Sequence, residues 1–217
     1  MSGAPAAPSA TGTHVLLVRH AEVENRAGLF YGRLPGFGLS ALGRQQAEAL
    51  AGALADEPLA ALYHSPLQRA EETAAIIAQR HRGLALQPAD PLLEVRSSWM
   101  GARFADVPVG VNLYEPPRSA DDETLSELAG RMTAFVAELT ERHAGQTVCC
   151  VSHGDPIAAA AACYRGDPLT LVTIRLKFPA VCSVTRVSIG ASSRVEHTDV
   201  LSQIAPALRT PRGTAGR

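Results

Sequence analysis

Short apolar runs that alternate with helical segments constrain the fold of this chain more than any other feature of its sequence. The runs have the length of buried strands and lie at residues 14–18, 59–63, 84–87 and 147–151. The segments between them have helical periodicity at 40–55, 66–81 and 124–143. This alternation is typical of α/β proteins, because a helix carries the chain back before the next parallel strand. The sequence therefore predicts a three-layer α/β sandwich with a mostly parallel central sheet and helices on both faces.

Helix-start signals support these boundaries and add further elements. Five side chains are predicted to cap helices, four of them followed closely by Pro or Glu: Ser40, Ser65 with Pro66, Thr124 with Glu127, Asp155 with Pro156, and Asp167 with Pro168. Residues 181–189 and 194–200 are predicted to be two further strands around a turn at 190–193.

The length of 217 residues fits one domain, which we place at residues 13–205. Residues 1–12 are predicted to be a disordered arm, and residues 206–217 a disordered tail. Residues 97–122 contain five Gly or Pro residues and no sustained period. A loop of this length inside a domain is usually a lid or a binding segment, so we predict a short lid at 97–122.

Composition excludes several classes of protein. The chain has 20 basic and 21 acidic residues and a net charge of −1, without the basic excess of nucleic-acid-binding proteins. It has no run of 18 apolar residues and no recognisable signal peptide, so we expect a cytoplasmic protein without a membrane partner. Its four cysteines form no C-x-x-C pair, which argues against a zinc ribbon or a redox site. We expect no metal or cofactor; a homodimer stays open.

Three of the predicted strands end in polar residues that have no place in a core. The pairs and their neighbours are Arg19-His20, His64-Ser65 with Arg69 beyond them, and Ser152-His153. The carboxyl ends of parallel strands meet at one edge of a sheet, near helix N-termini, where ligands bind. We therefore expect these side chains to converge on one pocket.

Two arginines and helix N-termini favour a dianion such as a phosphate group. A neutral imidazole there is a nucleophile toward phosphorus, and neighbouring positive charges lower its pKa and keep it unprotonated. The second histidine can donate to oxygens that gain charge in the transition state. A carboxyl group must protonate the leaving alkoxide, and Glu94 is the best-placed candidate.

The motifs around these residues resemble those of the histidine phosphatase superfamily, which includes the cofactor-dependent phosphoglycerate mutases. The similar segments are LLVRHAE (16–22), LSALGRQQA (39–47), SPLQRA (65–70), the stretch 92–94 and VSHGDPI (151–157). The resemblance covers about residues 14–200 and implies a phosphoglycerate mutase-like fold, with residues 13–205 as the catalytic domain.

The resemblance implies roles for individual residues and no metal. His20 would be the phosphorylated nucleophile, and Arg19, Arg69 and His153 would bind the phosphoryl group. Glu94 would be the proton donor. Asn25 resembles the asparagine that helps to hold the phosphate, although it stands one residue closer to His20 than is usual.

Several positions depart from the usual motifs. Ala21 replaces a glycine, and Asp155 replaces a second glycine after His153. His64 stands where Ser or Thr is common. We assign His64, Asp155 and Trp99 to substrate binding; the alternatives are a structural histidine, a helix cap and lid packing, respectively.

Three functions are consistent with this resemblance and these candidate residues. The leading one is a phosphomonoester hydrolase that acts through a phosphohistidine on a small phosphorylated metabolite. The alternatives are a phosphotransferase of the phosphoglycerate mutase type and a non-catalytic phospholigand-binding relative. The lid is short and has only two basic residues, which favours hydrolysis, and its apolar residues favour a substrate with an apolar or aromatic part. Those residues could instead pack onto the core.

Overall fold

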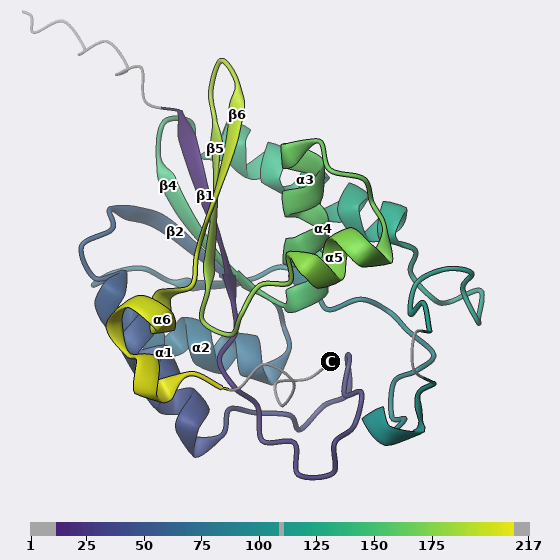
Figure 1. The fold of residues 1–217 in the computed structure, drawn as a ribbon. Helices are drawn as coiled ribbons and strands as arrows, with labels where there is room; N and C mark the ends of the chain where they lie inside the picture. The colour runs from purple at the N-terminus through teal and green to yellow at the C-terminus, as the bar shows by residue number, and fades with distance from the viewer. Residues whose placement is uncertain (1–11, 109–110, 211–217) are drawn as a thin grey trace, which may run out of the picture.

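One mixed sheet forms the centre of the computed structural model, which describes residues 12–108 and 111–210 (Figure 1). Its six strands within these residues are β1 (Thr13–Arg19), β2 (Leu59–His64), β3 (Leu86–Pro88), β4 (Thr147–Ser152), β5 (Val184–Ile189) and β6 (Ser193–Thr198). Their order is β3-β2-β4-β1-β5-β6. The first four in this order are parallel, whereas β5 is antiparallel to both β1 and β6. The predicted α/β sandwich is confirmed, with an antiparallel pair at one edge.

Helices cover both faces of the sheet. The α-helices are α1 (Ala41–Ala53), α2 (Gln68–Ala78), α3 (Leu125–Arg142), α4 (Gly154–Arg165), α5 (Leu171–Leu176) and α6 (Val200–Ile204). Single 3-10 turns are η1 (Asp90–Leu92), η2 (Phe104–Asp106) and η3 (Pro206–Leu208). In Figure 1, α1, α2 and α6 lie on one side of the sheet, and α3 and α4 lie on the other.

The alternation of β1 side chains builds the two core layers. Leu16 and Val18 pack in the cluster formed with α1, α2 and α6, whereas Val15 and Leu17 pack in the cluster formed with α3 and α4. All four are fully buried. Full burial of such a side chain stabilises a fold by about 1.5–3 kcal/mol, which explains why this strand is apolar on both faces.

Two of the predicted helix caps are confirmed. The Ser40 side chain accepts from the Gly43 N–H at the start of α1. At the start of α3, Thr124 and Glu127 form a complete capping box. In both cases the capping partner lies within three residues, so a local signal sufficed.

Three other predicted caps are wrong. The N-cap of α2 is Leu67 instead of Ser65, and that of α4 is His153 instead of Asp155. Asp167 follows α4, and the next helix, α5, begins after Thr170. The side chains of Ser65 and Asp155 are engaged elsewhere, as described below, and Asp167 binds Arg165 and Lys177.

The chain ends differ from expectation where they are described. Residues 206–208 form η3, and the Thr210 hydroxyl donates to Glu22, so the ordered chain extends beyond the predicted boundary at 205. The other residues of the predicted tail, 211–217, and residues 1–11 of the arm lie outside the described residues. The lid at 97–122 is irregular except for η2, and its residues 109–110 also lie outside them.

The described residues contain four free cysteines and no helix that could span a membrane. Cys149, Cys150 and Cys182 are buried and free of disulfides, and Cys163 is exposed and also free. Within residues 12–108 and 111–210, every helix is too short or too polar to cross a bilayer.

Gly43 permits the close approach of α1 to the segment that follows β1. A Cβ atom at Gly43 would lie 2.0 Å from the Glu22 carbonyl oxygen, whereas one at Gly52 in the same helix would meet open space. We expect Gly43→Ala to lower the free energy of unfolding by about 2 kcal/mol or more, because backbone must move. Gly52→Ala should instead raise it by about 0.5–1 kcal/mol. Urea unfolding of both variants measures this difference, and equal effects would contradict the packing argument.

Candidate active site

The register of the parallel strands brings the polar strand ends together. Arg19 of β1 pairs with Ser152 of β4. One residue further, the His20 N–H donates to the Ser152 carbonyl over 3.0 Å, and the Ser65 N–H donates to the Val151 carbonyl over 2.9 Å. The ladder therefore continues into the loops and aligns the ends of β1, β4 and β2. His20 and His153 lie with their ring centroids 5.1 Å apart.

The His20 ring is held in one tautomer by its hydrogen bonds. Its Nδ1 lies 2.7 Å from the Ala21 carbonyl oxygen, which can only accept, so Nδ1 carries the proton. Its Nε2 accepts from the Arg69 Nε–H over 3.2 Å. The lone pair of His20 is therefore on Nε2, the atom that faces the guanidinium group.

His20 is also kept neutral by its surroundings. The ring is 2% exposed, and burial lowers its pKa well below the usual range, with smaller contributions from the positive charges of Arg69 and Arg19. The neighbouring arginines were expected to lower this pKa, and they do so, but burial contributes the larger part. A neutral imidazole with its lone pair on Nε2 has the form that a nucleophile requires.

Ser65 orients the second histidine. The Leu67 N–H donates to Ser65 Oγ over 3.4 Å, and Ser65 Oγ lies 2.8 Å from His153 Nε2. In the tautomer in which the Ser65 hydroxyl donates to His153 Nε2, the imidazole proton is on Nδ1. That Nδ1 is buried and has no partner among the described residues. Sequence reasoning took Ser65 for a helix cap and missed this role.

The two arginines are held by backbone carbonyls and aromatic rings. Arg19 donates to the Pro179 carbonyl over 2.7 Å and lies over the Phe178 ring at 4.9 Å. Arg69 donates to the Gly32 carbonyl over 2.7 Å and lies over the Tyr31 ring at 4.6 Å. Neither guanidinium has a carboxylate partner within salt-bridge distance among the described residues. Their positive charges are thus available to an anion in the pocket.

Glu94 and Asp155 form a pair of carboxyl groups beside these cations. The two side chains hydrogen-bond to each other, and Asp155 Oδ1 also accepts from the Tyr114 hydroxyl. Burial, followed by the negative charge of Asp155, raises the pKa of Glu94 to about 8. Burial also raises the pKa of Asp155. Burial and the second carboxyl thus favour the protonated form of Glu94, the form that a proton donor requires.

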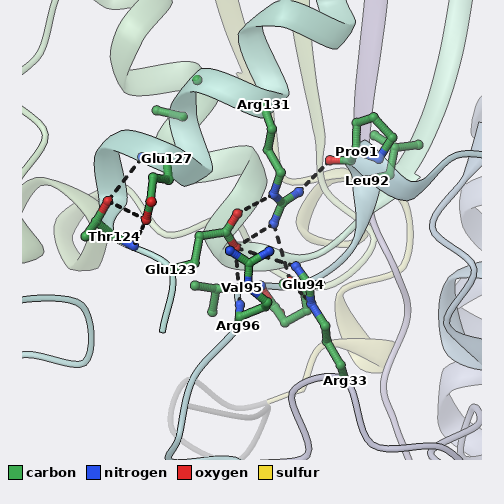
Figure 2. A network of polar contacts seen from close by, with 12 residues as sticks. Arg33, Pro91, Leu92, Glu94, Val95, Arg96, Glu123, Thr124, Glu127 and Arg131 are labelled. Atoms are coloured by element: carbon green, nitrogen blue, oxygen red, sulfur yellow. Dashed lines mark hydrogen bonds and ion pairs between the residues drawn. The ribbon is translucent and has the colours of Figure 1, made fainter. Parts of the chain in front are cut away.

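The backbone around Glu94 is anchored by a network of ion pairs and hydrogen bonds (Figure 2). Arg131 binds the buried Glu123 carboxylate with contacts of 2.6 and 3.0 Å, and it also donates to the Glu94 carbonyl over 3.3 Å. Arg33 donates to the same carbonyl over 2.6 Å and lies 3.5 Å from Glu123. The Arg96 N–H donates to Glu123 as well. The loop that carries Glu94 is thereby fixed from both sides.

Three residues assigned to the site are occupied by local contacts. Asn25 exchanges two hydrogen bonds of 3.0 Å with the backbone of Leu29, so both polar atoms of its amide close its own loop. His64 Nδ1 lies 2.9 Å from the Ser65 carbonyl oxygen. Trp99 packs against the Arg118 guanidinium at 3.9 Å. A contact of Asn25, His64 or Trp99 with a ligand stays a prediction.

A cavity of about 890 Å³ opens from Arg19 and Asp155 toward the lid and α5. Its walls are largely apolar, with side chains from η2, the lid, α4 and α5, among them Phe104, Val107, Leu113, Ile174 and Phe178. Some of the apolar lid residues thus line a cavity. Within the residues described, no group of three or more His, Cys, Asp or Glu side chains is arranged to hold a metal ion.

Comparison with known proteins agrees with this geometry. The family described as the histidine phosphatase superfamily (branch 1) matches residues 15–198. An uncharacterized protein of Mycobacterium tuberculosis is 45% identical over 152 residues, which are 67% of this chain and 75% of that protein. Phosphoserine phosphatase 1 of Hydrogenobacter thermophilus is 34% identical over 166 residues, which are 72% of this chain and 78% of that protein.

A solved structure has the same fold. It is a mycobacterial glucosyl-3-phosphoglycerate phosphatase with a TM-score of 0.72 and 27% sequence identity. The match covers 84% of this chain and 96% of the other.

Removal of the Ser65 hydroxyl should release the His153 tautomer. We expect Ser65→Ala to lower kcat for p-nitrophenyl phosphate about tenfold. Without the Ser65 hydroxyl, the His153 Nδ1–H is no longer held in place to donate to the phosphoryl oxygens. Long-range ¹H–¹⁵N spectra should show His153 protonated on Nδ1 in the parent. In the variant they should show exchange between the Nδ1-protonated and Nε2-protonated tautomers. Ser183→Ala is the matched control, because Ser183 is also buried and its hydroxyl has no partner among the described residues. An unchanged tautomer in Ser65→Ala would refute the assignment.

Proposed function

The chain belongs to branch 1 of the histidine phosphatase superfamily, and on this premise we propose that it hydrolyses a small phosphomonoester through a phosphohistidine at His20. It is a phosphatase of this superfamily, as its relatives are. The observation that carries the proposal is the neutral His20 ring with its Nε2 lone pair directed at Arg69. No other described imidazole combines these contacts with two unpaired guanidinium groups.

The proposed reaction begins when the phosphomonoester dianion of the substrate accepts hydrogen bonds from Arg69, Arg19 and His153 Nδ1. This exchange frees the lone pair of His20 Nε2, which attacks phosphorus while the bond to the ester oxygen breaks. Glu94 gives its proton to the departing alkoxide. In the second step the Glu94 carboxylate takes a proton from water, the hydroxide attacks phosphorus, the P–N bond breaks, and phosphate leaves with His20 neutral again.

This chemistry requires no metal in our proposal. The positive charges of Arg19 and Arg69 and the N–H of His153 supply the stabilisation of phosphoryl oxygens that a metal supplies in other phosphotransfer enzymes. Their placement in a buried pocket strengthens each of these interactions. We propose a cytoplasmic protein whose substrate is a small phosphomonoester.

The cavity supports a substrate with an apolar or aromatic body. Arg19 and Asp155 line the same cavity as the apolar side chains of the lid and α5. If Arg19 binds the phosphoryl group, the rest of the substrate would lie against these apolar side chains. The relatives named for phosphoserine and glucosyl-3-phosphoglycerate show that this fold accepts different monoesters. We propose that the apolar wall, formed by Phe104, Leu113 and Ile174, selects among them here.

The mutase alternative has weaker support. A mutase must hold a phosphorylated intermediate while it reorients and must keep water from the phosphohistidine. The short lid carries only Arg103 and Arg118 as basic residues, and Arg118 is stacked on Trp99. Conversion of 3- to 2-phosphoglycerate faster than phosphate release would favour the mutase. A non-catalytic role, the third alternative, would show no turnover of any monoester.

Replacement of His20 tests the covalent step. We expect His20→Ala to abolish turnover of p-nitrophenyl phosphate and to remove an acid-labile phosphoenzyme that the parent forms with ³²P-labelled substrate. The reason is that no other nucleophile lies at the position of Nε2. Retention of more than a few per cent of the parent activity would show that His20 is not the nucleophile. His14→Ala is the control, because His14 lies on β1 and its imidazole Nδ1 hydrogen-bonds to Ser188.

Replacement of Glu94 tests the general acid. A carboxyl with its pKa raised to about 8 is protonated at lower pH, so turnover should fall as pH rises through about 8. We expect Glu94→Gln to abolish this dependence and to lower kcat about 100-fold or more for alkyl phosphates, whose leaving groups need a proton. For p-nitrophenyl phosphate the loss should be less than tenfold. Equal losses on both substrates would point to a structural role.

A further inference from the structure

We propose that Tyr114 is a positioning residue that decides which of the two paired carboxyls, Glu94 or Asp155, carries the catalytic proton. This inference rests on the proposed phosphatase function and deepens it. In this arrangement the Tyr114 hydroxyl holds the negative charge on Asp155, and Asp155 in turn keeps the proton on Glu94.

The geometry of the three groups supports this assignment. The Tyr114 hydroxyl donates to Asp155 Oδ1, and the Asp155 carboxyl meets the Glu94 carboxyl on its other side. Among the described residues, no side-chain hydroxyl donates to Glu94 in this way, and its Oε1 accepts from the N–H of Val95 over 2.9 Å. The two carboxyls therefore differ in environment, and a differing environment is what separates the protonation of paired acids.

The position of Tyr114 is fixed by the core. Its side chain is 3% exposed and packs in a cluster with Leu125, Leu128 and Ala158 of α3 and α4. Its N–H donates to Asn112 Oδ1 over 3.0 Å. Burial and the neighbouring Asp155 charge raise the pKa of Tyr114 well above its usual range, so the hydroxyl stays a donor at any working pH.

The direction of the effect follows from the charges. A hydrogen bond to a carboxylate favours its ionised form, so Tyr114 favours ionised Asp155. A negative charge next to a second carboxyl disfavours ionisation of that group, so ionised Asp155 keeps Glu94 protonated. Without the hydroxyl, Asp155 competes for the shared proton and Glu94 loses it at lower pH.

Besides Asp155 and Tyr114, other charged and titratable groups also face Glu94. They are Arg19 of β1, Arg69 of α2, and Tyr31 and Arg33 of the loop before α1. Arg69 and Arg19 lower the pKa of Glu94, and Tyr114→Phe leaves both in place.

The test is the pH dependence of kcat/KM for an alkyl phosphate in the parent, in Tyr114→Phe and in Tyr63→Phe. Tyr114→Phe keeps the ring that fills the core and removes only the hydroxyl. We expect the alkaline limb, near pH 8 in the parent, to move down by about one pH unit in Tyr114→Phe. Tyr63→Phe is the matched control, because its buried hydroxyl contacts His143 and Arg142, away from the carboxyl pair, and its limb should not move.

A second set of variants tests whether the effect of Tyr114 acts through Asp155. The single variant Asp155→Asn should also shift the limb downward, and adding Tyr114→Phe to it should give no further shift, because the hydroxyl then has no carboxylate to stabilise. A shift in Tyr114→Phe below about 0.2 pH units, or an equal further shift in the double variant, would overturn the proposal.

A readout without turnover separates this proposal from the proposed function. The titration of the Glu94 carboxyl can be followed by ¹³C NMR in the inactive His20→Ala background, with and without Tyr114→Phe. A downward shift of the Glu94 titration supports the proposal even if no monoester is hydrolysed. An unchanged titration in an active phosphatase would refute the proposal and leave the function standing.

Discussion

The parallel register of β1, β4 and β2 is the constraint on which the site depends. It places Arg19 beside Ser152 and His64 beside Val151, so that the next residue of each strand enters the same pocket. The backbone hydrogen bonds continue past the strand ends to His20 and Ser65. A slip of one residue would turn these side chains to the opposite face of the sheet. The apolar core therefore fixes the active-site geometry as a consequence of packing.

Sequence patterns predicted the features whose partners are close in the chain or whose burial is unambiguous. The four parallel strands and the caps Ser40 and Thr124 belong to this group. The caps predicted at Ser65 and Asp155 failed because each side chain has a distant partner: His153 for Ser65 and Tyr114 for Asp155. A capping signal measures only local options, and a buried long-range hydrogen bond prevails over it.

The convergence of strand ends was predictable, whereas the network that supports Glu94 was not. Arg131 lies on α3, in the middle of an amphipathic helix, and its interior partners Glu123 and the Glu94 carbonyl lie in loops (Figure 2). In the sequence, Arg131 resembles any arginine on a solvated helix face. One sign was present in the sequence: an acidic residue, Glu123, stands directly before the Thr124 cap. Only the fold shows that this carboxylate turns inward.

A general acid beside two guanidinium groups is electrostatically difficult, and the arrangement of this pocket offsets the difficulty. In the proposed reaction Arg69 and Arg19 would stabilise a phosphate dianion, but the same charges favour the ionised form of Glu94. Burial opposes them and is the largest influence on Glu94, and the Asp155 carboxylate opposes them further. Burial also keeps His20 and His153 neutral, because it disfavours their charged forms. One property, burial at the sheet edge, thus leaves the arginines as the fixed charges and keeps Glu94 protonated and His20 neutral, the states that the proposed reaction requires.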